Sequence, residues 1–284
     1  MKFLLSLHKF LKGMKSRILL LIMLLTAAGV SAQEDLSRLN TYGASRDNKY
    51  RDIKNECIST WMFQVTYAHH WPGADTKELY NHNNSIGGGV YYKTDKNWLF
   101  GFNGNFISGN KVNISREDLF GEILDVNGEI ITGDGIYGSY ALFERGAHFQ
   151  LCAGKVFAFK KPNPNSGIFV KGGLGYLFNR LRTEFGSYAS PPPALNGDYL
   201  YGYDRKRGGF AYSGEIGYFF LSSTRMLNFS VSFEFTQAHT VPQREWDFHL
   251  MQGDTSRYLD RYYGIRFAIY IPTYKRAPAD YYYY

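Results

Sequence analysis

The feature that most constrains this chain is a two-residue alternation of large apolar side chains with small or polar ones. In the run 227–236, for example, Leu, Phe and Val occupy the odd positions, and Asn, Ser, Glu and Thr occupy the even ones. A period of two is typical of β-strands whose two faces meet different environments. Eight runs show it: 61–68, 86–93, 98–107, 148–159, 168–179, 210–220, 227–236 and 262–271. The sequence therefore predicts an all-β fold of eight strands. Lys155 interrupts the fourth run, which suggests a bulge or a register slip there.

The two faces of these runs differ in kind. One is bulky and aromatic, in a chain that is 18% Phe, Trp and Tyr, and the other is Gly, Ser, Asn and Thr with isolated charges. A soluble sandwich would show water a larger and more charged face. About ten tilted residues cross an apolar layer of about 25 Å. We therefore expect an eight-stranded antiparallel up-and-down transmembrane β-barrel over 61–274, with lipid outside. A soluble periplasmic sandwich and a lipocalin-like barrel are the alternatives.

The connections between the runs alternate in length. Short turns at 95–97, 161–166 and 222–225 join the second run to the third, the fourth to the fifth and the sixth to the seventh. Segments of about 12 to 40 residues join the remaining consecutive runs, which is the barrel pattern of short periplasmic turns and long outer loops. An even number of strands places both ends of the barrel on the periplasmic side.

The N-terminal segment has the pattern of a secretory signal peptide. Five basic residues precede a short apolar run at 18–25, and small residues follow at 30–32. The apolar run is too short to span a membrane as a helix. We expect cleavage after Ala32, a periplasmic leader at 33–60, a periplasmic tail at 275–284 and a location in the bacterial outer membrane. Removing the five basic residues lowers the formal charge from +7 to about +2, so we expect outer-membrane lipid and not nucleic acid as a partner.

Four charged residues fall on the small face of the predicted strands: Lys171, Glu215, Glu234 and Arg266. Lys93 is a further candidate. Charges buried in a lumen must be paired, so we expect a structural network of ion pairs. A gate or a proton-linked site is the alternative. A register slip of one residue would turn the whole set toward lipid.

The loops and tails give local predictions. In the longest loop, 108–147, Ser115 is expected to cap a short helix, and 126–129 and 133–135 are expected to form turns. The segment 136–145 either extends the fourth strand or folds back as a lid. The proline run 191–193 suggests a stiff solvated loop rather than a ligand patch. The tyrosines at 281–284 suggest interfacial anchoring.

No residue pattern indicates an enzyme or a metal site. The candidates near the outer rim show no nucleophile–base–orienter spacing; they are Ser230, His239, Thr240, Asp247, His249, Asp254 and Asp260. His69, His70 and His82 lack the further ligands that would complete a metal site. We expect no cofactor, and no disulfide between Cys57 and Cys152.

Several stretches carry a likeness to a known family. They are 124–128 with 134–135, 144–148 with 154–155, 162–167 and 202–205. On these the chain resembles an uncharacterised family of Bacteroidota outer-membrane β-barrel proteins, which implies the fold and the location but transfers no catalytic residue. The layout is also similar to small OmpA- or OmpX-type barrels, by fold alone.

These observations lead us to expect a non-enzymatic barrel with a structural or accessory role in an outer-membrane assembly, transport or secretion complex. An outer-rim lipid or peptide hydrolase, a narrow channel and an adhesin-like surface barrel are the alternatives.

Overall fold

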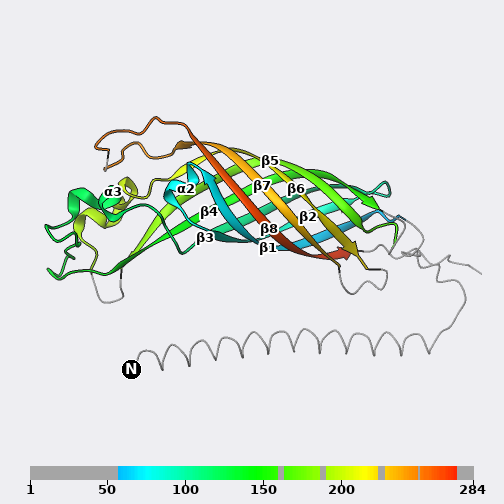
Figure 1. Ribbon diagram of the computed structural model, residues 1–284, viewed down its shortest axis with the longest axis horizontal. Helices are drawn as coiled ribbons and strands as arrows, with labels where there is room; N and C mark the ends of the chain where they lie inside the picture. Colours follow the sequence, from blue (N-terminus) through cyan, green and yellow to red (C-terminus); the bar gives the residue numbers. More distant parts are fainter. Residues whose placement is uncertain (1–56, 159–162, 186–189, 223–227, 249, 274–284) are drawn as a thin grey trace, which may run out of the picture. The chain divides into compact units, whose positions relative to one another are not determined.

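Eight antiparallel strands close into a barrel in chain order, with β1 pairing back onto β8. The computed structural model describes residues 57–158, 163–185, 190–222, 228–248 and 250–273. The strands are β1 (Thr60–Ala74), β2 (Asn83–Lys93), β3 (Trp98–Gly109), β4 (Tyr140–Ala158), β5 (Gly167–Phe185), β6 (Arg207–Leu221), β7 (Asn228–Pro242) and β8 (Tyr258–Thr273). Figure 1 shows them tilted around the barrel, with α2 and α3 gathered at one end. The predicted antiparallel up-and-down barrel is confirmed. No helix in the described part of the chain is long and apolar enough to cross a membrane.

Several strands extend further toward the long loops than the alternation indicates. β4 begins at Tyr140 and β5 continues to Phe185, and the two remain paired over this whole length. Side chains contribute to this extension as well, because the rings of the paired residues Tyr140 and Phe185 lie 6.2 Å apart and pack against the buried cluster of the long loops. Of the segment 136–145, the part from Tyr140 onward therefore extends β4, and residues 136–139 belong to the preceding loop.

The predicted bulge at Lys155 is wrong. Its pairing is continuous on both sides, opposite Trp98 on β3 and Val170 on β5. The side chain lies on the outer face with its Nζ 5.2 Å from the centre of the Trp98 ring. Because a lysine can lie along an aromatic surface and still keep its charge in water, it fits the apolar face without a break in register.

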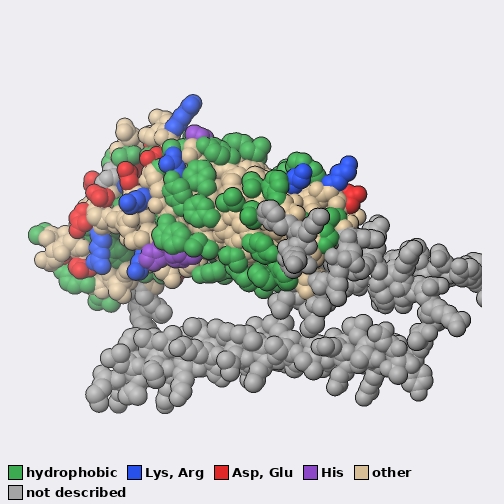
Figure 2. All heavy atoms as spheres, turned by 45° about the vertical axis from the view of Figure 1, so that its right-hand side comes forward, with side chains coloured by type: hydrophobic (Ala, Val, Ile, Leu, Met, Phe, Trp, Pro, Cys, Tyr) green, Lys and Arg blue, Asp and Glu red, His purple; other side chains and the backbone are tan. Residues whose placement is uncertain are grey.

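The outer face of the barrel is a belt of exposed apolar side chains. Along β1, the outward residues Trp61, Phe63, Val65 and Tyr67 are each about half exposed. Outward side chains of the other strands continue this belt. Figure 2 shows it as a broad hydrophobic band over the strands, with charged side chains toward the ends of the barrel. Soluble monomers rarely expose a continuous apolar surface of this extent.

The inner face is small and polar, and glycines let the strands approach closely. At Gly175 on β5, an added Cβ would lie 1.9 Å from the carbonyl oxygen of Phe149 on β4. Toward the short turns, the interior is closed by larger side chains, among them Met62, Tyr91, Phe169 and Phe219. The inside of the barrel is therefore filled by side chains, as expected for eight strands.

The long loops fold into a small structure with its own buried cluster. It includes Leu79 of α2 (Thr76–Leu79), Leu119 of α3 (Arg116–Phe120), Leu195 of η2 (Pro193–Leu195) and Tyr203, which follows η3 (Gly197–Gly202). A further short helix, η1 (Gly121–Ile123), follows α3.

Several loop predictions can be compared with this structure. Ser115 caps α3 by accepting a hydrogen bond from the Asp118 N–H, as predicted. The two predicted turns are present, with Gly128 at φ 75° and Gly135 at φ 76°. The prediction that the proline-rich loop is solvated is wrong. Leu195 is buried, and Ser190 donates two hydrogen bonds to Asp134 of the 108–147 loop. Apolar contacts between loops far apart in sequence override the local composition.

Some predictions fall outside the described residues. They are the signal peptide 1–32, the leader up to residue 56, His249, and the tail 275–284 with its tyrosines.

Candidate functional site

The structure brings the four charged residues predicted for the lumen into one group. Lys171 Nζ lies 2.8 Å from Glu215 Oε2, and Arg266 Nε lies 2.6 Å from Glu234 Oε2. Arg266 Nε also lies 3.9 Å from Glu215 Oε2, which links the two pairs. Each of the four residues is buried. Two positive and two negative charges thus compensate one another inside the barrel, which is how buried charges are tolerated.

His70 joins this group, and the sequence reasoning missed it. Its Nε2 contacts Glu234 Oε1, and its Nδ1 lies 3.0 Å from Asn83 Oδ1. The neighbouring His69 points outward, with Nδ1 2.8 Å from Asn84 Oδ1. Successive residues of a strand face opposite sides. His70 has the same even parity as the inward Gln64 on β1, and this parity could have indicated that His70 points into the barrel.

Lys93 also points inside, but it does not join the carboxylates. Its Nζ donates to Asn165 Oδ1 at 2.9 Å and to the Ile58 carbonyl at 3.0 Å. It holds the chain around residue 58 and the β4–β5 connection together at the short-turn end. The suggestion that Lys93 extends the charge network is wrong, because the side chain reaches neutral oxygens at that end.

The space left beside the charge network is very small. A cavity of about 10 Å³ is bounded by His70, Asn105, His148, Glu234 and Arg266, among others. That volume holds about one water molecule. At this level of the barrel, the described side chains leave space in this cavity for about one water molecule.

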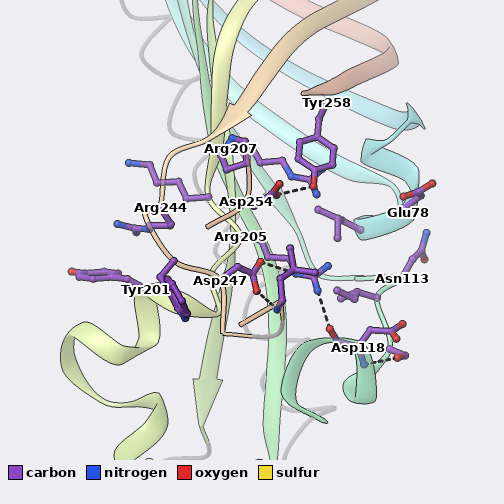
Figure 3. A pocket seen from close by; sticks show the side chains of 18 residues that line it. Glu78, Asn113, Asp118, Tyr201, Arg205, Arg207, Arg244, Asp247, Asp254 and Tyr258 are labelled. Atoms are coloured by element: carbon purple, nitrogen blue, oxygen red, sulfur yellow. Dashed lines mark hydrogen bonds and ion pairs between the residues drawn. The ribbon is translucent and has the colours of Figure 1, made fainter. Parts of the chain in front are cut away.

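The larger cavity lies among the long loops (Figure 3) and has a volume of about 450 Å³. Its walls carry both signs of charge and several aromatic rings. The basic residues are Arg205, Lys206, Arg207 and Arg244; the acidic ones are Glu78, Asp118, Asp247 and Asp254; the aromatic ones are Tyr201, Trp246 and Tyr258. Sites for small ligands commonly have this size and combine apolar walls with a few polar groups. This loop-end cavity is the candidate functional site.

One wall of the loop-end cavity is fixed by a forked ion pair. Arg244 Nε donates to Asp204 Oδ1 at 3.0 Å, its Nη2 contacts Asp204 Oδ2, and its Cζ lies 4.3 Å from the centre of the Tyr201 ring. Asp204 also accepts a 3.1 Å hydrogen bond from the Lys206 N–H. This bidentate geometry joins the β5–β6 loop to the β7–β8 loop.

A second wall is built on β8. The Arg207 Cζ lies 3.4 Å from the centre of the Tyr258 ring, and the Tyr258 hydroxyl donates to Asp254 Oδ2 at 2.8 Å. Burial disfavours the charged form of Asp254, but hydrogen bonds from Ser256 and Tyr258 outweigh it and lower the pKa of the carboxyl. Asp254 thus stays ionised at neutral pH.

The side chain of Arg205, in the β5–β6 loop, contacts residues of two other loops. Its Nη2 donates to the Asp118 carbonyl at 2.8 Å, and its Nε lies 4.0 Å from Asp247 Oδ2. Its φ of 42° lies in the left-handed region, which is uncommon for a residue other than glycine. Strained backbone of this kind is concentrated at functional sites.

The candidate catalytic residues are not brought together. Thr240 donates inside the barrel to Asp260 Oδ2 at 2.7 Å, and Ser230 Oγ lies 3.2 Å from the Tyr270 hydroxyl in the interior. His239 is on the opposite, outer face against Tyr212. Asp247 and Asp254 line the loop-end cavity.

The possible metal ligands and the two cysteines are placed as follows. His69 and His82 lie on the outside with ring centres 5.5 Å apart, away from the inward His70. Within the described ranges, no three His, Cys, Asp or Glu side chains form a group that could hold a metal. Cys57 and Cys152 are both free thiols, the first exposed and the second buried.

Comparisons with known proteins add little beyond the fold itself. No protein-family model matches the chain, and no curated protein is similar to it in sequence. Solved structures of Ail, the attachment invasion locus protein of Yersinia pestis, align with it over 75% of this chain and 97% of theirs. One has a TM-score of 0.39 at 10% identity, and another, bound to the heparin analogue sucrose octasulfate, has 0.35 at 12%. The resemblance to the Bacteroidota family stays a prediction.

Proposed function

We propose that this chain is a non-enzymatic outer-membrane β-barrel that acts as an accessory protein, binding a partner protein at its loop end. The loop-end cavity of about 450 Å³, above an interior with room for about one water, carries the proposal. A barrel that offers a binding surface and so little space beside its interior charges fits recognition better than conduction.

The exposed belt supports the membrane location. Large aromatic and aliphatic residues cover the outward positions of the strands, and at the short-turn end Lys155 lies over Trp98. Lysines that lie along aromatic rings at the limit of an apolar band are typical of the boundary between lipid and water.

Exposed side chains around the loop-end cavity support a protein partner. Trp246 and Tyr201, both lining residues, are 49% and 46% exposed, and Met251 is 59% exposed. Aromatic residues, Met and Arg are enriched at protein interfaces. A partner in an assembly, transport or secretion complex of the outer membrane is the occupant we propose.

Two alternative functions, a narrow channel and a hydrolase, fit this arrangement less well. A channel needs a continuous wet path, which the ion pairs of Lys171 and Arg266 block. A hydrolase needs a nucleophile beside a base, and His239 and Ser230 lie on opposite faces of β7.

Site-specific photocrosslinking in intact outer membranes tests the proposal. A photoreactive residue at position 246 should give a reproducible protein adduct, while one at Asp95, exposed in the β2–β3 turn, should not give the same adduct. Arg205→Ala should weaken the adduct at 246. Absence of any adduct at 246, or an identical adduct at both positions, would contradict the binding role.

Membrane insertion is tested separately. The folded protein should fractionate with outer membranes and migrate differently on gels before and after boiling. A freely soluble pool would overturn the membrane location whatever the crosslinking shows.

A further inference from the structure

Three basic residues form a row across neighbouring strands on the outside of the barrel. Arg145 on β4 stands directly opposite Arg180 on β5. Lys206 directly precedes Arg207, the first residue of β6, whose register partner Asn179 is the chain neighbour of Arg180. Arg145 and Arg180 share the outward side of β4 and β5 with Phe149 and Tyr176. Adjacent strands are about 4.8 Å apart, so the row extends over about 10 Å.

No carboxylate of the described residues forms an ion pair with this row. Arg145 Nη1 donates to Ser108 Oγ at 2.9 Å and to the Glu144 carbonyl at 2.8 Å, both neutral acceptors. Lys206 Nζ lies 5.9 Å from the centre of the Phe178 ring. Like charges directly opposite one another on a sheet destabilise it, so an anion bound at this row would stabilise it.

A neighbouring position shows what a compensated charge looks like here. Arg182, two residues further along β5, has its Nε 3.0 Å from Glu184 Oε1. Among the described residues, the surface thus carries one paired arginine close to three cations that have no carboxylate within ion-pair distance.

The row lies at the loop-side limit of the apolar belt. Four residues closer to the short turns, Phe149, Tyr176 and Phe210 face one another across the same strands, and each is about half exposed. Four residues of strand correspond to about 13 Å. In a barrel embedded by its aromatic belt, the three cations therefore lie at the depth of lipid headgroups.

We propose that Arg145, Arg180 and Lys206 bind the phosphate groups of anionic lipids in the leaflet on the loop side. Arginine donates two parallel hydrogen bonds to a phosphate, and lysine adds a point charge. Two neighbouring cations share one phosphate, so the row holds a headgroup with more than one phosphate better than a headgroup with one. This inference rests on the membrane location in the proposed function. Lys206 also lines the loop-end cavity, whereas Arg145 and Arg180 do not, so the variants of these two arginines test the lipid contact apart from the partner protein.

Lipid binding by the full-length protein in neutral detergent micelles tests the inference. Native mass spectrometry would compare lipid A carrying two phosphates with its dephosphorylated form. We expect the phosphorylated lipid to bind about tenfold more tightly to the unaltered protein, since one charge-assisted contact corresponds to that factor. The double variant Arg145→Gln with Arg180→Gln should lose this preference.

Two matched controls remove a cation elsewhere on the outer face. Arg182→Gln removes the neutralised arginine, and Lys155→Gln removes a cation at the opposite limit of the belt. Both should keep the preference. If the double variant does not fold, the single variants Arg145→Gln and Arg180→Gln should each reduce the preference.

Equal binding of the two lipids, or a preference unchanged by the Arg145 and Arg180 variants, would overturn the inference. So would an equal loss in the Lys155 control. Gel migration before and after boiling, measured on the same samples, separates the two proposals. A protein that folds in micelles and inserts in membranes but shows no phosphate preference disproves this inference alone.

Discussion

Lys171 and Glu215 face one another across β5 and β6, and their charged groups meet at 2.8 Å inside the barrel. The next strand adds a like charge, because Glu215 is also the register partner of Glu234 on β7. Two carboxylates directly opposite one another repel. Lys171 on one side and Arg266 on the other compensate them, so the four charges stabilise the barrel only as a set.

Breaking the Lys171–Glu215 pair should be costly. Lys171→Met leaves the buried Glu215 with the hydrogen bond from Ser232 and only the longer ion pair with Arg266. We expect the free energy of unfolding to fall by about 3 to 5 kcal/mol. The double variant with Glu215→Met should recover most of this loss, because both charges are then removed. Urea unfolding in micelles measures the difference.

The exposed Arg182–Glu184 pair is the control for that experiment. Arg182→Met should cost less than about 1 kcal/mol, because solvent screens an exposed pair. Similar losses at the two sites would show that the interior pair is not shielded from water.

Much of the barrel could be predicted because its two faces meet different surroundings. The alternation located all eight strands, and the small-face positions of Lys171, Glu215, Glu234 and Arg266 indicated that they lie inside. The inward direction of His70 follows from the same parity, but the sequence analysis considered His70 only as a metal ligand, with His69 and His82, and did not assign it to the lumen.

The loop-end cavity could not be predicted in the same way. The residues that build it, such as Arg205 and Arg244, come from loops without a period, and their partners Asp118 and Asp204 are distant in sequence. Contacts of that kind depend on how the loops pack after the barrel closes. The sequence left open whether 136–145 extends the fourth strand or folds back as a lid, and the pairing of β4 with β5 shows the extension from Tyr140 onward.

Two glycines on neighbouring strands should differ in how well they tolerate an added methyl group. Gly175→Ala places a Cβ against the Phe149 carbonyl, and we expect a loss of about 2 kcal/mol or more in the free energy of unfolding. At Gly214, on the outer side, no atom lies within 4 Å of the added Cβ. Gly214→Ala should therefore change stability by less than about 0.5 kcal/mol. Urea unfolding of both variants in micelles measures this difference, and equal effects would contradict the close approach of β4 and β5.

The two thiols should differ in reactivity. Cys57 is exposed, whereas Cys152 is buried on β4. In the folded protein, a maleimide should label Cys57 at least about tenfold faster than Cys152, because a thiol must be accessible as well as deprotonated to react. Cys57→Ser should abolish the fast phase, and denaturant should make Cys152 reactive. Two fast thiols in the folded protein would place Cys152 outside the interior.

Asp204 should hold two long loops in place. Its carboxylate receives the fork of Arg244 and the N–H of Lys206, so Asp204→Ala leaves the Arg244 guanidinium without its partner. We expect faster hydrogen exchange at 190–206 and 243–257, while the protection of β1 to β8 stays unchanged, because local opening of a loop does not require the barrel to unfold. Hydrogen exchange followed by mass spectrometry measures both. Asp125→Ala is the matched control, since its carboxylate stabilises a turn in the 108–147 loop through Asn127 and Glu129. Loosening of the same two loops by the control, or of the strands by Asp204→Ala, would show that the Asp204–Arg244 pair does not act as a local clamp.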